Sequence, residues 1–222
     1  MSMDPIIAWA VAFMVSWAPP GRSKIKDAIE TPEAGQARYG EIARAAARVA
    51  YDPYLKPLFH GPRGRASTMA VLLSIAYHES GFRRDVDLGV GKLARGSGTD
   101  SCLLQIRVGR GKTSEGWTHD DLVGDREKCF RAGYSLIKRS FGACRRLPQL
   151  DWLGAYTRGR CVEGDPLSRA RIGLSQRAPQ APLDDAAALA AAAQAAPAEL
   201  PAPPAPAGPP AAPAPAPPAL KE

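Results

Sequence analysis

Histidine is scarce in this chain of 222 residues, and closely spaced cysteine pairs are absent. The chain has three histidines and four cysteines, and the cysteines follow one another at separations of 27, 15 and 17 residues. Structural zinc sites take four Cys or His ligands, usually from pairs that stand only a few residues apart. The composition therefore predicts no metal site, and no pattern in the sequence implies another cofactor.

The glycine patterns of nucleotide-binding loops are incomplete. The stretch "VGRGKTSEG" has Ile106 where a phosphate-binding loop needs a glycine, and "LGVGKLARGSG" lacks the third glycine of a dinucleotide fingerprint. The pair His78-Glu79 is followed by Phe82 where a zinc-protease helix needs a second histidine. Arginines are spread along the chain without a nucleic-acid-binding motif, so we expect no nucleic-acid partner.

A long hydrophobic run is also missing. Residues 6–18, "IIAWAVAFMVSWA", are thirteen mostly apolar residues, whereas a membrane span needs about 20. A signal peptide has a core of this length, but the preceding "MSMDP" contains no lysine or arginine. Residues 1–30 are therefore interpreted either as a signal or anchor with its linker, or as a helix that is buried or touches a membrane.

Aromatic residues are absent from residues 178–222, which consist mostly of alanine and proline. Such a segment has little to bury, so we expect a disordered, extended tail. The tail holds one lysine and four acidic residues, so residues 1–177 carry a formal charge of +10, against +7 for the whole chain. A body this basic favours a polyanionic partner such as an anionic membrane or a cell wall.

The remaining residues, 31–177, predict one mainly α-helical domain with a loop-rich middle. Apolar residues recur there at helical spacing, and capping residues mark several helix ends. The expected helices are 31–51, 67–80, 125–140, 148–158 and 165–176. Residues 83–124 are glycine-rich and irregular, with short strands expected around "CLLQIRV".

The four cysteines fit two disulfides better than four buried thiols, although cysteine buries readily in either state. Cys144 follows one expected helix and Cys161 follows the next, so one bridge would join them. Cys102 would then pair with Cys129. The spacing alone leaves the connectivity open.

The stretch "LLSIAYHESGF", residues 72–82, places a glutamate on an apolar helical face. Met69, Leu72, Leu73 and Ala76 form a stripe at helical spacing, and Glu79 continues it. Glu79 therefore stands where a carboxylate is costly, in the last turn of its helix.

The position of Glu79 has two interpretations, a catalytic role and an ordinary ion pair at a helix end. Apolar surroundings and the negative end of the helix dipole both raise the pKa of a carboxyl group. A glutamic acid that keeps its proton is suited to act as the general acid in glycosidic bond cleavage. The alternative is a glutamate at a helix end that pairs with Arg83 or Arg84.

Three stretches, "AYHESGF", "SCLLQIR" and "LGAYTRGRC", resemble in order and spacing the motifs of the soluble lytic transglycosylase and goose-type lysozyme superfamily. The resemblance covers roughly residues 66–165. It implies that Glu79 is the catalytic acid and that Ser80 supports the site. It further implies that Gln105 hydrogen-bonds substrate and that Tyr156 packs beside Glu79 and orients it.

The sequence departs from the family pattern in two motifs. Cys102 and Leu103 replace the usual residues of the second motif, and Thr157 stands where the family has asparagine. The first change is tolerable if Cys102 forms a disulfide. The second puts one polar contact near the acid in doubt.

The resemblance implies a lysozyme-like α+β fold and cleavage of the β-1,4 bond between N-acetylmuramic acid and N-acetylglucosamine in peptidoglycan. A lytic transglycosylase with one catalytic glutamate is the preferred activity. A hydrolytic lysozyme and an inactive wall-binding protein on the same scaffold are the alternatives. We expect a monomer that binds glycan strands, exported to the periplasm, cell wall or exterior, or associated with a phage, and residues 6–18 could contact a membrane.

Hydrolysis with inversion needs a second carboxylate that activates water. The candidates are Asp85 and Asp87, just after the Glu79 helix, and Asp100, five residues before Gln105. Asp85 and Asp87 lie beside Arg83 and are expected to form salt bridges, which leaves Asp100 as the best placed.

Overall fold

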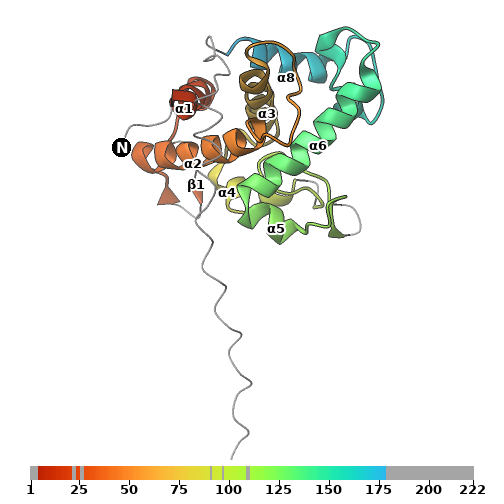
Figure 1. Cartoon of the computed structure of the whole chain (residues 1–222). Coiled ribbons are helices and arrows are strands. Elements are labelled where there is room, and N and C mark those ends of the chain that lie inside the picture. Colours follow the sequence, from red (N-terminus) through yellow and green to blue (C-terminus); the bar gives the residue numbers. More distant parts are fainter. Residues whose placement is uncertain are drawn as a thin grey trace, which may run out of the picture.

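The residues that the computed structural model describes are 5–21, 24–25, 28–90, 92–96, 98–108 and 111–178. Over these ranges the chain is mainly helical, as the sequence predicts (Figure 1). The strands in this part of the chain, β1 (Lys24–Ile25) and β2 (Ala28–Ile29), pair as one short antiparallel hairpin. From residue 179 onward, the predicted disordered tail lies outside the described residues.

The N-terminal apolar segment forms a helix that packs into the core. The helix α1 (Pro5–Trp17) contacts α2 (Pro32–Ala50) and α3 (Gly64–Ser80) (Figure 1). It buries Ile6, Ile7, Ala10, Val11, Phe13 and Met14. Of the interpretations that the sequence left open, burial against the domain is the one observed. Within the described ranges, no helix combines the length and the apolarity that a membrane crossing requires.

The limits of α2 match the sequence prediction because local caps define them. The Thr31 hydroxyl accepts a hydrogen bond from the Ala34 N–H at 3.2 Å, and proline occupies the first turn. The residues expected to face inward are all buried: Tyr39, Ile42, Ala46 and Val49.

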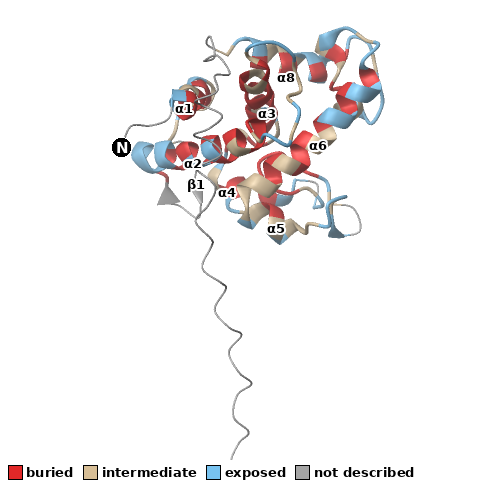
Figure 2. Ribbon diagram, viewed as in Figure 1, coloured by how far each residue is buried: buried red, intermediate tan, exposed pale blue. Residues whose placement is uncertain are grey.

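The helix α3 is the most enclosed element, and it begins earlier than predicted. Every residue from Thr68 to Ala76 is buried (Figure 2). Ser67 or Thr68 is the capping residue that the sequence predicts for this helix, but the helix begins at Gly64 and Thr68 lies inside it. Its hydroxyl donates to the Gly64 carbonyl at 2.8 Å and accepts from the Leu58 N–H at 2.8 Å, so it ties the preceding loop to the first turn.

The middle of the chain contains short helices and turns in place of the strands expected around residues 102–108. The helices are α4 (Arg84–Asp87), η1 (Lys92–Arg95) and α5 (His119–Gly124). Cys102 and Gln105 have φ angles of 57° and 46°, which a strand cannot accommodate. The strand prediction was wrong because the backbone turns sharply at these two residues.

The C-terminal half matches the predicted helices closely. Asp125 caps α6 (Arg126–Cys144), which runs four residues past the expected end at 140. The short segments η3 (Gln149–Asp151) and α7 (Gly154–Arg158) follow. Asp165 then caps α8 (Pro166–Gln176) through the N–H groups of Leu167 and Ser168.

Two disulfides connect these parts, with the predicted pairing. Cys102 is bonded to Cys129, which ties the turn at 102–105 to α6. Cys144 is bonded to Cys161, which ties the end of α6 to the segment after α7. The helix α8 packs on α3, and α6 packs on α2 and α7. This packing gathers the last turn of α3, the 102–105 turn, α6, α7 and α8 around one hollow.

Candidate functional site

Glu79 lies in the last turn of α3 and its side chain is 23 % exposed. The helix ends at Gly81, whose N–H donates to the Tyr77 carbonyl at 2.7 Å. His78 faces solvent, as expected from its position one residue earlier on the helix. The carboxylate therefore sits at the edge of the buried face, within reach of solvent.

The partner of Glu79 is Arg171 on α8, which the sequence did not single out. The Arg171 Nη2 and Nε groups donate to Glu79 Oε1 at 2.7 and 3.2 Å. The Arg171 Nη1 group donates to the Leu167 carbonyl at 3.0 Å, and the Ser74 hydroxyl donates to the Arg171 carbonyl at 2.6 Å. The alternative interpretation places Arg83 or Arg84 beside Glu79, whereas the structure shows Arg171 on α8 as its partner.

Only one of the two carboxylate oxygens of Glu79 is occupied. Both hydrogen bonds from Arg171 go to Oε1, and no other described residue donates to Glu79. In the described part of the chain, no buried side-chain oxygen or nitrogen lacks a partner. Among the described residues, Oε2 therefore has no donor and is left for solvent or a bound molecule.

Gln105 is held in a strained turn near the same place. Its side-chain amide donates to the Cys102 carbonyl at 3.0 Å, and its N–H donates to the same carbonyl at 3.0 Å. A β-carbon on Gly96 would lie 2.5 Å from Gln105 Oε1 and 2.6 Å from Asp100 Oδ2. A side chain at 96 would have to displace both groups, and the Asp100 carboxylate lies beside the Gln105 amide.

Tyr156 enters from α7 and connects these parts. Its hydroxyl donates to the Leu104 carbonyl at 3.1 Å, and its N–H donates to the Ser140 hydroxyl at 3.0 Å. Desolvation raises the pKa of Tyr156 far above its usual range, and the negative charge of Glu79 raises it further. The phenol therefore stays a neutral donor that fixes the 102–105 turn. It does not hydrogen-bond to Glu79.

These three side chains line one cleft of about 630 Å³. Glu79, Gln105 and Tyr156 are the residues that the three sequence motifs point to, and they come from α3, the turn and α7. Among the described residues that line the cleft, Glu79 is the only acidic one. The lining of the cleft therefore combines one carboxylate, one side-chain amide and one partly buried phenol.

The other predicted site residues have local roles. The Ser80 hydroxyl donates to the Ala76 carbonyl at 2.6 Å and accepts from the Phe82 N–H at 3.3 Å, so it completes the helix end. Thr157 lines the cleft where the family has asparagine. Its single hydroxyl hydrogen has three acceptors within reach, Asp165 Oδ2 at 2.5 Å and the Leu153 and Gly154 carbonyls at 3.1 and 3.3 Å.

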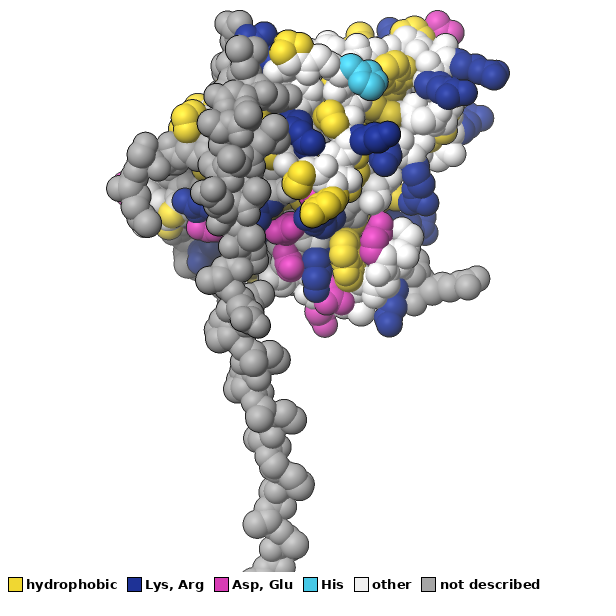
Figure 3. Space-filling view, viewed as in Figure 1, with side chains coloured by type: hydrophobic (Ala, Val, Ile, Leu, Met, Phe, Trp, Pro, Cys, Tyr) yellow, Lys and Arg dark blue, Asp and Glu magenta, His cyan; other side chains and the backbone are white. Residues whose placement is uncertain are grey.

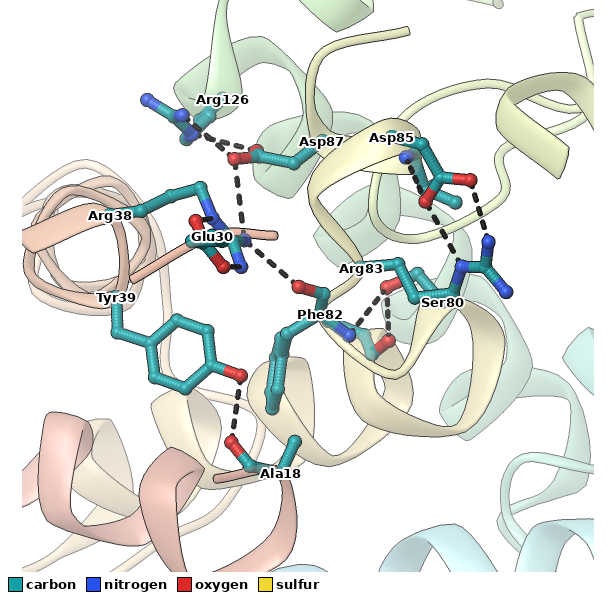
Figure 4. A network of polar contacts seen from close by, with 12 residues as sticks. Ala18, Glu30, Arg38, Tyr39, Ser80, Phe82, Arg83, Asp85, Asp87 and Arg126 are labelled. Carbon is teal, nitrogen blue, oxygen red and sulfur yellow. Dashed lines mark hydrogen bonds and ion pairs between the residues drawn. The ribbon is translucent and has the colours of Figure 1, made fainter. Parts of the chain in front are cut away.

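Asp85 and Asp87, which do not line the cleft, pair with arginines just after the end of α3 (Figure 4). Asp85 pairs with Arg83 at 2.7 Å, as the sequence predicts. The Arg83 guanidinium helps hold the pKa of Asp85 below its usual range, although burial acts in the opposite direction as the largest influence. Asp87 pairs with Arg126 at 2.8 Å and with Arg38 at 3.6 Å.

A metal site is not indicated in the described part of the chain, where no cluster of three histidine, cysteine, aspartate or glutamate side chains could hold an ion. Comparisons with protein-family models, with curated proteins and with solved structures find no match to this chain. The likeness to the lytic transglycosylase superfamily thus remains a likeness of three short motifs.

Proposed function

We propose that this chain is a peptidoglycan-cleaving glycosidase that acts on the β-1,4 bond between N-acetylmuramic acid and N-acetylglucosamine. The observation that carries the proposal is the convergence of Glu79, Gln105 and Tyr156 on one cleft. These residues are separated by 26 and 51 positions in the sequence, and each was selected from a different motif. A chance resemblance of three stretches gives no reason for them to meet.

Glu79 is the proton donor in this proposal. Oε2 is the open oxygen, so it is the atom that would protonate the leaving oxygen of the glycosidic bond. Arg171 stabilises the ionised carboxylate that is left after this transfer, because it donates two hydrogen bonds to Oε1. In this proposal, Glu79 therefore gains its proton while its contact with Arg171 is loosened. Substrate that binds beside Arg171 loosens that contact.

We infer that the product is the 1,6-anhydro sugar. With one carboxylate lining the cleft, Glu79 acts first as acid and then as base. In the second step it removes the proton from the 6-hydroxyl of the muramic acid, and that oxygen bonds to the anomeric carbon. Asp85 and Asp87, two of the three candidates for activating water, are occupied by arginines away from the cleft.

Asp100 supports a second candidate, a hydrolytic lysozyme. Its carboxylate lies beside the Gln105 amide, and its charge contributes to raising the pKa of Tyr156. Asp100 is thus close to the cleft, although it does not line it. An inverting hydrolase places its two carboxylates about 6.5–9.5 Å apart with a water between them.

The molecular context agrees with a wall substrate. Two disulfides favour an oxidising compartment, so we propose a periplasmic, cell-wall or extracellular location, or a phage particle. The formal charge of +10 on residues 1–177 suits a polymer rich in carboxylates and phosphates. In this proposal the domain has a lysozyme-like α+β fold, and the alanine- and proline-rich tail is a disordered spacer.

The test is to incubate the purified full chain with peptidoglycan sacculi and to follow both turbidity and product mass. Clearing is expected, with released muropeptides one water lighter than hydrolysed ones. Fully hydrated muropeptides, together with loss of activity in Asp100→Asn, would favour the lysozyme instead. Binding of sacculi without any released product would indicate an inactive wall-binding protein.

A further inference from the structure

Two arginines in the cleft pair with no carboxylate of the described residues. Arg107, two residues after Gln105, and Arg139 on α6 both line the cleft and are exposed. Neither makes an ion pair or a side-chain hydrogen bond with any described residue. Arg171, the third arginine of the cleft, is by contrast bonded to Glu79.

The cleft is therefore strongly basic. Its lining holds three arginines and one glutamate among the described residues, a formal charge of +2. Figure 3 shows lysine and arginine side chains over much of the upper and right part of the face drawn, and acidic side chains gathered lower down. Positive charge that is unpaired inside a hollow is better explained by a ligand than by the general basicity of the chain.

Both arginines project from backbone that is firmly held. Arg139 belongs to the face of α6 that also presents Leu136, Ser140 and Ala143 to the cleft, at helical spacing. The turn before Arg107 is fixed by the Ile106 N–H, which donates to the Ser101 carbonyl at 2.8 Å. The held backbone fixes where the two side chains begin, and the planar guanidinium fork can then bind a carboxylate through two parallel hydrogen bonds.

We propose that Arg107 and Arg139 form an anion subsite that recognises the carboxylates of a muramyl strand, an inference that rests on the proposed function. Each muramic acid carries a lactyl group, which either ends in a carboxylate or continues into a peptide stem with carboxylates of its own. Oligomers of N-acetylglucosamine carry neither. The subsite thus selects muramyl strands over neutral chitin-like strands.

The experiment measures binding of three soluble ligands by calorimetry, with the full chain in a Glu79→Gln background so that the ligands stay intact. The ligands are a muramyl tetrasaccharide with peptide stems, the same strand after an amidase has removed the stems, and chitotetraose. The variants are Arg107→Ala, Arg139→Ala, their combination and Arg139→Lys. Arg146→Ala is the control, because Arg146 is exposed just after α6 and does not line the cleft.

Each alanine substitution is expected to weaken binding of a carboxylate-bearing strand about tenfold, the loss of one charge-assisted hydrogen-bonding group. Arg139→Lys should lose less than Arg139→Ala, and binding of chitotetraose should not change. If the stem-free strand shows the same losses, the subsite recognises the lactyl carboxylate. If only the strand with stems shows them, it recognises the peptide.

The proposal is overturned if the Arg107→Ala/Arg139→Ala protein binds both carboxylate-bearing strands as tightly as the Arg146→Ala protein. A failure of the proposed function has a different signature. The chain with Glu79 intact would then bind muramyl strands with the predicted arginine dependence and release no product from sacculi. In that outcome the anion subsite stands and the glycosidase does not.

Discussion

Two groups of arginine–carboxylate contacts involve the end of α3 or the residues just after it, and they differ in how far they are buried. In the first group, Arg38 donates to Glu30 at 2.7 and 2.9 Å and to the Phe82 carbonyl at 2.9 Å (Figure 4). The Glu30 and Asp87 side chains in this buried network are 3 % and 1 % exposed. In the second group, Arg171 holds Glu79, whose side chain is 23 % exposed and lines the cleft.

The difference distinguishes an ion pair that stabilises the fold, Arg38–Glu30, from one that would serve the proposed reaction, Arg171–Glu79. In the buried network, Glu30 accepts through both oxygens, and Arg38 donates through three nitrogens to Glu30 and to the Phe82 carbonyl, so both side chains are held by the protein itself. In the cleft pair, Glu79 keeps Oε2 open. Breaking the first should lower stability, because a buried charge would lose its partner. Breaking the second should lower activity and leave stability nearly unchanged.

The largest effect is expected for Glu79→Gln in the cleft. Glutamine has the same shape and can still accept from Arg171, but it cannot donate a proton to a leaving group. Clearing of sacculi should fall on the order of a thousandfold, as for loss of a general acid. The melting temperature should stay close to that of the parent.

The matched control is Glu41→Gln, which changes an exposed glutamate on α2 that pairs with Arg44. It should clear sacculi at the parent rate. A Glu79→Gln protein that retains a tenth of the parent rate would remove Glu79 from its role as acid.

Breaking the buried network of Arg38 and Glu30 should instead lower the stability of the protein. Arg38→Ala leaves the buried Glu30 carboxylate without its donor, and the free energy of unfolding should fall by about 3–5 kcal/mol. Urea denaturation measures this. Arg44→Ala, which breaks the exposed pair with Glu41, should lower it by no more than about 1 kcal/mol. If the two variants lose the same stability, burial does not distinguish the pairs.

Removing the two disulfides one at a time should cost similar stability but affect clearing of sacculi differently. They close loops of 27 and 17 residues, and replacing either pair by serine should cost about 3 kcal/mol. Loss of Cys102–Cys129 should also reduce clearing, because it frees the turn that carries Gln105. Loss of Cys144–Cys161 should affect clearing less. Equal losses of clearing per folded molecule would show that the turn needs no such support.

Much of this arrangement was readable from the sequence where local signals decide it. The N-terminal ends of α2 and α8 follow from Thr31-Pro32 and Asp165-Pro166, because an N-cap residue and a proline in the first turn act on the adjacent backbone. The pair Arg83–Asp85 was predictable for the same reason. The strand expected near 102–108 failed, since apolar alternation carries no information about the positive φ angles at Cys102 and Gln105.

The site was predictable only in part. The motifs identified Glu79, Gln105 and Tyr156, whereas Arg171 lies 92 residues from its partner in a helix whose pattern is ordinary. Only the packing of α8 on α3 brings the two together. The signal that could have found Arg171 is its place on α8 one turn after the cleft-lining Leu167, and it becomes visible once the fold is known.

The smallest effect concerns His78, which reports on the cleft pair without taking part in it. Partial burial lowers the pKa of His78, the positive charge of Arg171 lowers it further, and the negative charge of Glu79 raises it. Arg177 also lowers this pKa, as the smallest of these influences, and the charges of Arg171 and Glu79 are the two that variants of the cleft pair can test. Arg171→Met should raise the pKa of His78, and Glu79→Gln should lower it.

An NMR titration of the His78 ring protons measures both, with Arg44→Met as the distant control. Opposite shifts mean that the two charges of the cleft pair stand beside His78 in solution, each acting on the ring with its own sign. Shifts in the same direction, or none beyond that of the control, would mean that Arg171 does not hold Glu79 in the free protein. The comparison between the buried network and the Arg171–Glu79 pair would then no longer hold.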